Sequence, residues 1–418
     1  MIVNGSEQYT TLISRMNREP HVLTPILRDL YYHRIENKVL CIAVTFEDLS
    51  TFVVSISHDD ANQFDFPNAT EMSYTTDAIN NRCYTNNISS PTIGSGFSTY
   101  INETHTLFGK VIDANRIIPL TIWHDVLHTY NQKAWEIIHQ TKNTPSVEYM
   151  HDLLNTLKRI ESAGLKVNLE LFNKTYEDRT KRAFKESMVY SEYNPYTITG
   201  RPSNRFGGIN FSALNKTDGT RDMFISRYDG GCLVQIDFEA YHLRLIANEL
   251  DINLPRDKSI HNELGKIYFG TNDISEDMYN ESKRRTFEII YGMSDETYGF
   301  DLFEKIQKIR QQYDGVSELT LPSGIHVNVE MPNASKLFNY YVQSLEVVRT
   351  APKLKAVLDL LDNTNHHLIL YTYDSILLDM ENFDESVMQQ IVIILEENKK
   401  FPVRIYRGDT YGSIDELN

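Results

Sequence analysis

The stretch HHLILYTYDSILLDM, residues 366–380, constrains the fold more than any other part of this 418-residue sequence. Two apolar runs typical of β-strands flank a short polar interruption that contains Asp374. An unpaired carboxylate inside such a strand would cost on the order of several kcal/mol if it were buried. Asp374 is therefore either an ordinary residue at the tip of a hairpin or a carboxylate that a rigid turn holds for a chemical purpose.

A second acid ends another apolar run. The segment GCLVQIDF, residues 231–238, is typical of a buried strand, and Asp237 lies at its end. Aspartate in this position is most often a helix cap or a turn former. Held beside Asp374, however, it would form a pair of carboxylates that can bind two Mg²⁺ ions about 3.5–4 Å apart. Such an ion pair stabilises both the attacking and the leaving oxygen of a phosphoryl transfer.

A helix predicted over NESKRRTFEIIYG, residues 280–292, could complement these acids. Lys283, Phe287 and Tyr291 are four residues apart, so they follow one helical stripe. A cation one turn from two aromatic rings suits a triphosphate below a sugar and a base. The alternative is a stripe of core-facing aromatic residues with a lysine that reaches solvent, and the periodicity alone favours this alternative.

The net charge of −16 is unfavourable for a nucleic-acid binder, because phosphate contacts need Lys and Arg. A local groove can nevertheless be basic. Basic residues concentrate at three places: Arg179, Lys181, Arg182 and Lys185; Arg201 and Arg205; and Lys283, Arg284 and Arg285. Such clusters are most often solvated helix faces, so charge leaves the question open.

Cysteine usage and hydropathy predict a location. Cys41, Cys83 and Cys232 form an odd set without CxxC spacing, which fits a reduced cytoplasm and no structural zinc. No apolar run approaches the roughly 20 residues of a membrane helix. The N-terminal residues also lack the pattern of a secretory signal. We therefore expect a cytoplasmic protein, in the host cytoplasm if it is viral, without a membrane partner.

Periodicity predicts further elements and an α+β fold. Residues 39–46 and 50–57 are apolar strands around the turn EDL and predict a hairpin. Residues 58–104 are rich in Asn, Thr and Ser and predict loops. Helices are expected over about 147–163 with a stop at Gly164, over about 169–187, and over 260–269.

Six segments, taken in order, resemble the sequence motifs of family A, the DNA polymerase I-like DNA polymerases. They are TITGRPSNRFGGINFSALN (197–215), DFEAYHLRLIA (237–247), IHNELGKIYFG (260–270), KRRTFEIIYG (283–292), NYYVQ (339–343) and YDS (373–375). Each motif is weak to moderate alone, and their order makes the resemblance specific over residues 149–418. The small size favours a phage-type member.

The resemblance implies an α+β, right-hand polymerase fold with an antiparallel palm sheet, helical fingers and a reduced thumb. A degenerate 3′–5′ exonuclease-like α/β domain would precede it. The expected divisions are 1–145 for the exonuclease-like domain, 146–190 for the thumb helices, 191–251 and 316–418 for the palm, and 252–315 for the fingers. So short a thumb implies poor processivity, or a processivity or replisome protein that supplies grip.

The resemblance also implies a template-directed DNA-dependent DNA polymerase that adds dNTPs to a primer 3′ end. Asp237 and Asp374 would bind two Mg²⁺ ions together with the Phe238 carbonyl, and Lys283 would protonate the leaving pyrophosphate. The dNTP would be bound by His261, Phe287, Tyr291, His242 and Arg284. The primer–template DNA would be bound by Arg201, Thr199, Asn339 and Gln343, at minor-groove acceptors that all base pairs share.

The sequence departs from the family pattern at three site positions. His242 replaces a glutamate that crowds the sugar 2′ position. Tyr279 replaces an arginine that grips the triphosphate, a role that Arg284 or Arg285 could take. Ser375 replaces the glutamate that follows the aspartate of motif C.

The N-terminal region departs from the exonuclease pattern as well. That nuclease needs an Asp-x-Glu pair on its first strand, whereas the strand end here reads Thr45-Phe46-Glu47. Asp29 and Asp125 are isolated acids and are best explained as structural residues. We therefore expect no proofreading.

Two alternatives stay open. A ribonucleotide-tolerant nucleotidyltransferase would follow if His242 leaves room for a 2′ hydroxyl. A catalytically inactive homologue that only binds primer–template in a replisome would follow from Ser375, Tyr279, the short thumb and the negative net charge. The presence of both aspartates and Lys283 opposes the second alternative.

Overall fold

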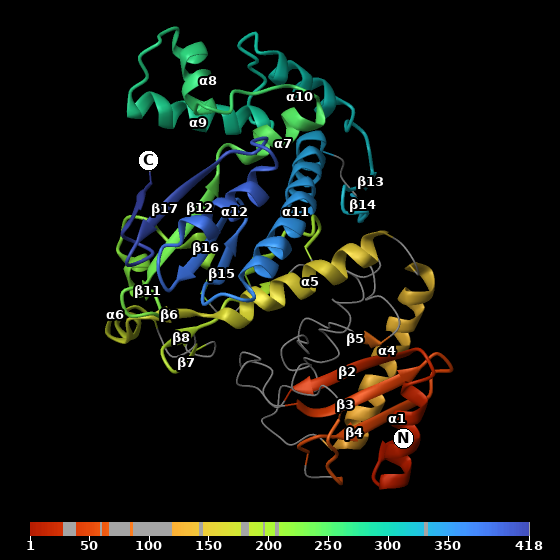
Figure 1. The fold of residues 1–418 in the computed structure, drawn as a ribbon. Helices are drawn as coiled ribbons and strands as arrows, with labels where there is room; N and C mark the ends of the chain where they lie inside the picture. The colour runs from red at the N-terminus through yellow and green to blue at the C-terminus, as the bar shows by residue number, and fades with distance from the viewer. Residues whose placement is uncertain are drawn as a thin grey trace. The chain divides into compact units, whose positions relative to one another are not determined.

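The computed structural model describes residues 1–27, 39–58, 61–66, 84–86, 119–141, 145–176, 184–194, 197–204, 209–329 and 333–417. The chain forms two compact units, drawn in Figure 1. The first comprises residues 1–164, 176–196 and 204–209, and the second comprises 165–175, 197–203 and 210–418. Both contain helices and sheets, so the predicted α+β class is confirmed.

The first unit contains a five-stranded sheet in the order β1–β4–β3–β2–β5. Its strands are β1 (Ile2–Val3), β2 (His21–Leu27), β3 (Val39–Phe46), β4 (Thr51–Ser55) and β5 (Tyr84–Asn86). β1 pairs with β4 in parallel, and the other pairs are antiparallel. The predicted hairpin is confirmed as β3–β4, in which Thr45 pairs with Thr51.

Among the described residues of this unit, the helices are α1 (Ser6–Met16), α4 (Leu120–Thr141) and α5 (Pro145–Ala163). Buried hydrogen bonds fix α4 on the sheet. Asn131 accepts from Thr24 at 2.6 Å and donates to the Thr45 hydroxyl at 2.9 Å, and the Trp135 indole donates to the Thr45 carbonyl at 3.1 Å. Thr45, where the sequence lacks the first nuclease acid, is thus part of the structural core. The predicted helix that stops at Gly164 is confirmed as α5.

The helix predicted over about 169–187 is confirmed over Leu169–Thr175 and is wrong over residues 184–187. Helix α6 (Leu169–Thr175) is followed by strands β7 (Phe184–Lys185) and β8 (Met188–Val189). The backbone of Glu186 and Ser187 has φ of 50° and 72°, which forms a tight hairpin turn and cannot continue a right-handed helix. Residues 177–183, with Arg179, Lys181 and Arg182 of the predicted basic cluster, lie outside the described residues, and so does most of the predicted loop region 58–104.

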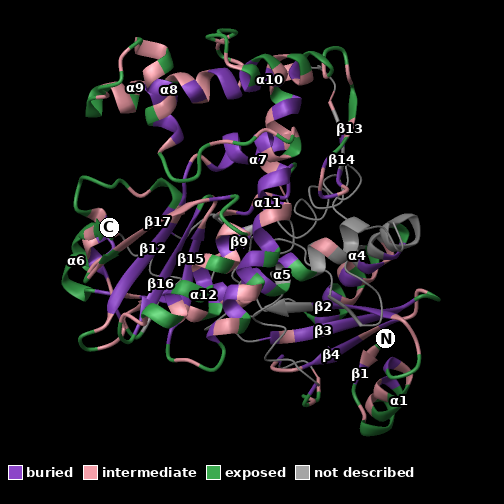
Figure 2. Ribbon diagram, turned by 45° about the horizontal axis from the view of Figure 1, so that its top comes forward, coloured by how far each residue is buried: buried purple, intermediate pink, exposed green. Residues whose placement is uncertain are grey.

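The second unit contains an antiparallel sheet in the order β15–β16–β12–β17–β18. The strands are β12 (Cys232–Phe238), β15 (His367–Thr372), β16 (Ser375–Met380), β17 (Val403–Gly408) and β18 (Ile414–Glu416). Helices α11 (Ala334–Leu361) and α12 (Glu385–Glu396) pack against it (Figure 1). The apolar strands β12, β15 and β16 form its buried centre (Figure 2), as their sequences predict.

Four helices share a second apolar core in this unit: α7 (Tyr241–Glu249), α8 (Ile260–Phe269), α9 (Glu276–Ile290) and α10 (Asp301–Gln311). Leu264, Ile290, Phe303 and Phe338 are among the residues that fill it, and Phe338 comes from α11. The predicted helices over 260–269 and 280–292 are therefore confirmed, although the latter begins earlier and ends at Ile290.

The remaining elements are short. They are β6 (Leu165–Val167), β9 (Tyr193–Asn194), β10 (Ser203–Asn204), β11 (Phe224–Ile225), β13 (Glu318–Thr320) and β14 (His326–Asn328), with 3-10 turns at Phe211–Ala213 and Thr220–Met223. Among the described residues, no helix combines the length and apolar character that crossing a membrane requires.

Candidate active site

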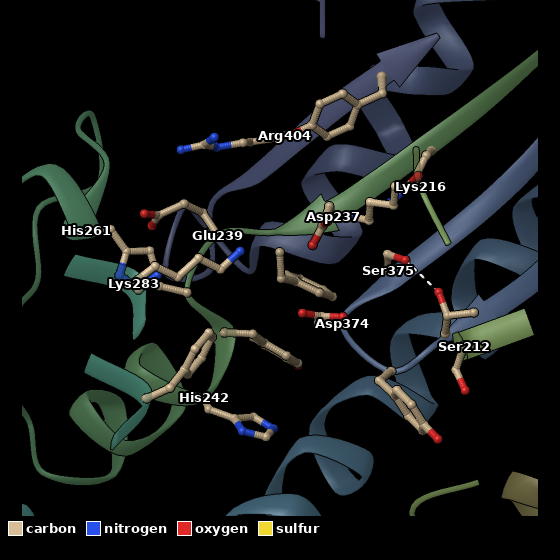
Figure 3. Close-up of a pocket in the computed structure, with 18 of the residues that line it drawn as sticks. Ser212, Lys216, Asp237, Glu239, His242, His261, Lys283, Asp374, Ser375 and Arg404 are labelled. Carbon is tan, nitrogen blue, oxygen red and sulfur yellow. Dashed lines mark hydrogen bonds between the residues drawn. The ribbon is translucent and has the colours of Figure 1, made fainter. Parts of the chain in front are cut away.

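The two predicted aspartates lie at one edge of the antiparallel sheet. Asp237 is the penultimate residue of β12, and Asp374 lies in the two-residue turn between β15 and β16. In the ladder Asp237 pairs with Ser375, and the Phe238 amide donates to the Asp374 carbonyl at 2.9 Å. Figure 3 shows both carboxylates pointing into the same space. Asp374 is thus a residue at a hairpin tip and also half of an acidic pair.

The electrostatics of this pair are unfavourable in the protein alone. Burial raises the pKa of Asp237 to about 7, and the nearby charge of Asp374 adds to the effect. Burial also raises the pKa of Asp374, and the buried Glu346 contributes. Neither carboxylate forms a hydrogen bond or an ion pair with another described residue. Lys216, Lys283 and Arg404 act on Asp237 only through space. Two buried acids that lack a direct cation contact are a donor set that suits a divalent metal ion.

Both aspartates line a cavity of about 300 Å³ within the second unit. Lys283 enters this cavity from α9, and Phe287 and Tyr291 follow it along the same helical stripe. The rings of Phe287 and Tyr291 stack with centroids 6.0 Å apart. The structure therefore favours the cavity-lining interpretation of the stripe over a purely core-facing one.

His261 lies at the side of the cavity, near the start of α8. Its ring packs edge-on against Tyr279 and Phe287 at 6.0 and 6.1 Å. Burial lowers the pKa of His261 to about 4, and the nearby charges of Lys283 and Arg404 act in the same direction. The imidazole is therefore neutral at physiological pH. Its buried Nδ1 has no hydrogen-bond partner among the described residues, so it is available to a ligand.

His242 belongs to a buried network that the sequence did not indicate. Its Nε2 contacts Glu346, and its Nδ1 lies 2.7 Å from the Tyr291 hydroxyl. Arg201 also bonds to Glu346, at 3.1 and 3.2 Å, and its guanidinium lies 3.7 Å above the Tyr373 ring, beside Asp374. Glu346 on α11 thus connects that helix to α7, which carries His242, and to the segment that carries Arg201.

The other predicted primer–template residues lie around this network. Thr199 donates to Gln343 at 3.4 Å, and its hydroxyl also accepts from the Arg201 amide at 3.4 Å. Asn339 is one turn before Gln343 on α11, and its buried Oδ1 has no partner among the described residues. Of these four residues, Arg201 lines the cavity itself.

Arg284 is not brought into the cavity. It is half exposed and forms ion pairs with Glu281 at 2.7 Å and with Glu288 on its own helix. Arg285 likewise pairs with Glu281 at 2.8 Å and covers the ring of Phe269. Neither arginine therefore takes the role that was expected of it, which was to replace the triphosphate-binding arginine of the family pattern at position 279.

Ser375 does not replace the missing third acid either. Its hydroxyl bonds to that of Thr372 at 2.7 Å (Figure 3). Within the part of the chain that the structure describes, no group of three or more His, Cys, Asp or Glu side chains could hold a metal ion. A metal here would therefore rest on the two aspartates and on main-chain or substrate oxygens.

Sequence reasoning missed four functional candidates: Lys216, Glu239, Glu346 and Arg404. Glu346 lies seven residues after Asn339 and three after Gln343, so helical spacing could have placed it on their face. Arg404 alternates with the apolar Val403 and Ile405, which assigns it to the other face of its strand. The order of the strands in the sheet decides which cavity this face lines, and the sequence does not reveal that order.

The comparisons with known proteins concern the fold. No protein family profile matches the sequence, and no curated protein matches it either. Among solved structures, the chain is similar to the polymerase domain of Pol1 from M. smegmatis, which was solved in complex with DNA primer-template and dNTP. The TM-score is 0.65 at 11% sequence identity, over 99% of this chain and 100% of that one. The chain therefore has the fold of a DNA polymerase domain.

Proposed function

We propose that this chain is a template-directed DNA polymerase of the family A type that adds dNTPs to a primer 3′ end. The observation that carries the proposal is the placement of Asp237, Asp374 and Lys283 in one cavity, at the edge of an antiparallel sheet. The fold likeness supports it, because the similar polymerase domain was solved with primer-template and dNTP.

Asp237, Asp374 and the Phe238 carbonyl would hold two Mg²⁺ ions. Neither buried carboxylate forms a hydrogen bond or an ion pair with a described cation, and the nearby cations act only through space, which fits this assignment. When bound, the ions would neutralise the charge that develops on the reacting phosphate oxygens. The role of the protein is to hold the two acids at a fixed spacing, which the ladder between β12 and β16 provides.

The remaining residues would bind and orient the substrates. Lys283 would contact the triphosphate and donate a proton to the leaving pyrophosphate. Phe287, Tyr291 and His242 would shape the pocket for sugar and base, and His261 would offer its free Nδ1 to a phosphate. Thr199, Arg201, Asn339 and Gln343 would contact the primer–template.

Domain roles follow from the same proposal. Residues 191–251 and 316–418 would be the palm, 252–315 the fingers and 146–190 a reduced thumb. Helices α8, α9 and α10 within 252–315 support the assignment of the fingers. Residues 1–145 would be an exonuclease-like domain without proofreading. This assignment is supported by the burial of Thr45 where the nuclease needs an acid, and by the exposure of Asp125.

Primer extension tests the proposal. The measurement uses a short primed DNA template with dNTPs and Mg²⁺, and compares the wild type with Asp374→Asn and with Asp314→Asn, a turn residue after α10. We expect the wild type and D314N to extend the primer, and D374N to lose at least roughly 1,000-fold in rate, because it removes charge that holds the ions. Equal extension by D374N would refute the two-aspartate site.

One observation favours a catalytically inactive binder as the second candidate. Ser375 stands where an acid is expected, and the described residues contain no larger metal-binding group. This alternative predicts that the wild type binds primer–template with ordinary affinity and extends nothing. The ribonucleotide-tolerant alternative rests on His242. It is tested in the same assay by comparing the incorporation of one rNTP with that of the matching dNTP.

A further inference from the structure

The cavity is rich in positive charge although the protein is acidic as a whole. Five Lys or Arg side chains line it, against three acids. Two of the five are already engaged: Arg201 pairs with Glu346, and Arg221 donates to the Leu214 carbonyl at 3.0 Å. Lys216 and Lys283 form no hydrogen bond or ion pair with a described residue. The fifth cation, Arg404, requires an explanation of its own.

Arg404 comes from the sheet and not from the helices. It lies on β17, where it pairs directly with Asp237 across the ladder. Side chains alternate along a strand, so Arg404 and Tyr406 both face the cavity. Arg407, on the other face of β17, instead covers the ring of Phe383 at 4.8 Å. Figure 3 shows Arg404 on the side of the cavity where Glu239 and His261 lie.

The guanidinium of Arg404 has a neutral hydrogen-bond partner, Tyr406 on the same face of β17, and one distant acid. Its ion pair with Glu416 is long, at 3.9 Å, and both side chains are partly exposed. Its charge acts on Asp237, on the His261 ring and on Tyr279. An anion bound between these groups would therefore meet Arg404 without breaking a strong internal contact.

Helix α9 presents one cation to the cavity among its described residues. That cation is Lys283, because Arg284 and Arg285 are held by Glu281 and Glu288 outside it. A nucleoside triphosphate carries up to four negative charges. Two metal ions and one lysine would leave its terminal phosphates without a bidentate partner from the protein.

We infer that Arg404 is a binding residue for the terminal phosphates of the incoming nucleoside triphosphate, reaching them from the sheet while Lys283 reaches them from α9. The inference rests on the proposed function. A guanidinium offers two parallel donors that match two phosphate oxygens, which the point charge of a lysine does not provide. The neighbouring Asp237 places this contact beside the metal-binding acids.

Steady-state primer extension tests the inference with three variants: Arg404→Leu, Arg404→Lys and, as a matched control on the same strand, Arg407→Leu. We expect R404L to raise KM for dTTP by roughly 10- to 100-fold, the usual effect of losing a charge-assisted hydrogen bond, with kcat changed only a few-fold. R404K should recover part of the loss, and R407L should behave as the wild type. Thermal melting of each variant checks folding.

A second measurement separates a failure of this inference from a failure of the proposed function. Inorganic tripolyphosphate with Mg²⁺ should bind the wild type and R407L equally, and R404L about 10-fold more weakly by calorimetry. If the enzyme extends primers but R404L and R407L have the same KM, Arg404 is not a phosphate ligand. If the wild type extends nothing, the proposed function fails, and tripolyphosphate binding alone decides the role of Arg404.

Discussion

Glu346 is a buried carboxylate that contacts two positively charged or chargeable groups, Arg201 and His242. Burial opposes its ionisation, but the contacts with His242 and Arg201 outweigh burial and lower the pKa of Glu346 below its ordinary value of 4.5. The carboxylate is therefore ionised at neutral pH. Through these contacts it fixes the positions of His242 and Arg201, which both line the cavity.

Glu346→Ala should destabilise the second unit by about 3–5 kcal/mol, because it leaves the buried side of Arg201 without a counter-charge. Glu346→Gln, which keeps the shape and one acceptor, should cost less. Since the pKa of Glu346 is lowered in the folded state, the ionised carboxylate stabilises the fold above about pH 4.5. This stabilisation is lost as the pH falls further. Urea unfolding at pH 7 and at pH 3.5 measures both effects.

The difference in unfolding free energy between the wild type and E346Q tests whether the charge of Glu346 stabilises the fold. The stability advantage of the wild type over E346Q should be largest near pH 7 and should shrink at pH 3.5. A gap that is the same at both pH values would show that the charge of Glu346 does not contribute. An E346A protein within about 1 kcal/mol of the wild type would show that Arg201 and His242 find other partners.

At the scale of elements, Glu239 joins the end of β12 to the start of α8. Its carboxylate accepts from the Ile260 amide at 2.8 Å and from Ser259 at 3.3 Å, so it caps the helix that carries His261. It also bonds to Arg244, at 2.9 Å from Nε. The strand that carries Asp237 and the helix that carries His261 are therefore connected by one side chain.

Glu239→Ala should loosen α8 without unfolding the sheet. Loss of the cap typically costs about 0.5–2 kcal/mol. Leaving the buried Arg244 without its partner adds about 3–5 kcal/mol. Amide hydrogen exchange followed by mass spectrometry should then show faster exchange in residues 260–269, while α12 exchanges as in the wild type. Glu239→Gln keeps an acceptor for the Ile260 amide and should lie in between. Unchanged exchange in α8 would mean that Glu239 does not hold the helix.

The elements with strong periodicity could be predicted from the sequence, and those set by local backbone geometry could not. The strands around Asp374 and the helices α5, α8 and α9 follow from their apolar spacing. The helix predicted over 169–187 is wrong at its end because Glu186 and Ser187 have positive φ and form a turn between two short strands. The sequence around this turn gives no sign of that backbone conformation.

Some residues of the candidate site could be predicted from the sequence, and others could not. Asp237, Asp374, Lys283, Phe287 and Tyr291 lie in ordered motifs, and the structure brings these five to one cavity. Arg404 and Glu346 were missed because they reach the site through pairing with residues more than 100 positions away. Such contacts depend on strand order and helix docking, which a single sequence pattern does not specify.

At the scale of the whole molecule, a net charge of −16 surrounds a cavity in which cations outnumber acids. Phosphate contacts supply much of the affinity of a DNA-binding protein, and each contact makes binding more sensitive to salt. Because 57 Asp and Glu outnumber 41 Lys and Arg over the whole chain, repulsion from a duplex is expected outside the cavity. We therefore expect the isolated chain to dissociate after on the order of a few nucleotides.

Primer extension on a long template, with a heparin trap added at the start, measures this processivity. Products should lengthen as salt is lowered, because electrostatic binding strengthens. Long products from single binding events at physiological salt would contradict the expectation. In that case Arg179, Lys181 and Arg182, which lie outside the described residues, would be the first candidates for substitution.

The hydrogen bond from the Phe238 amide to the Asp374 carbonyl has a consequence for divergence. The spacing of the two acids is set by main-chain atoms, which are the same whatever side chains β12 and β16 carry. Mutations that preserve strand character can therefore accumulate around the two positions without moving them. A site built in this way can keep its geometry while the side chains around it change.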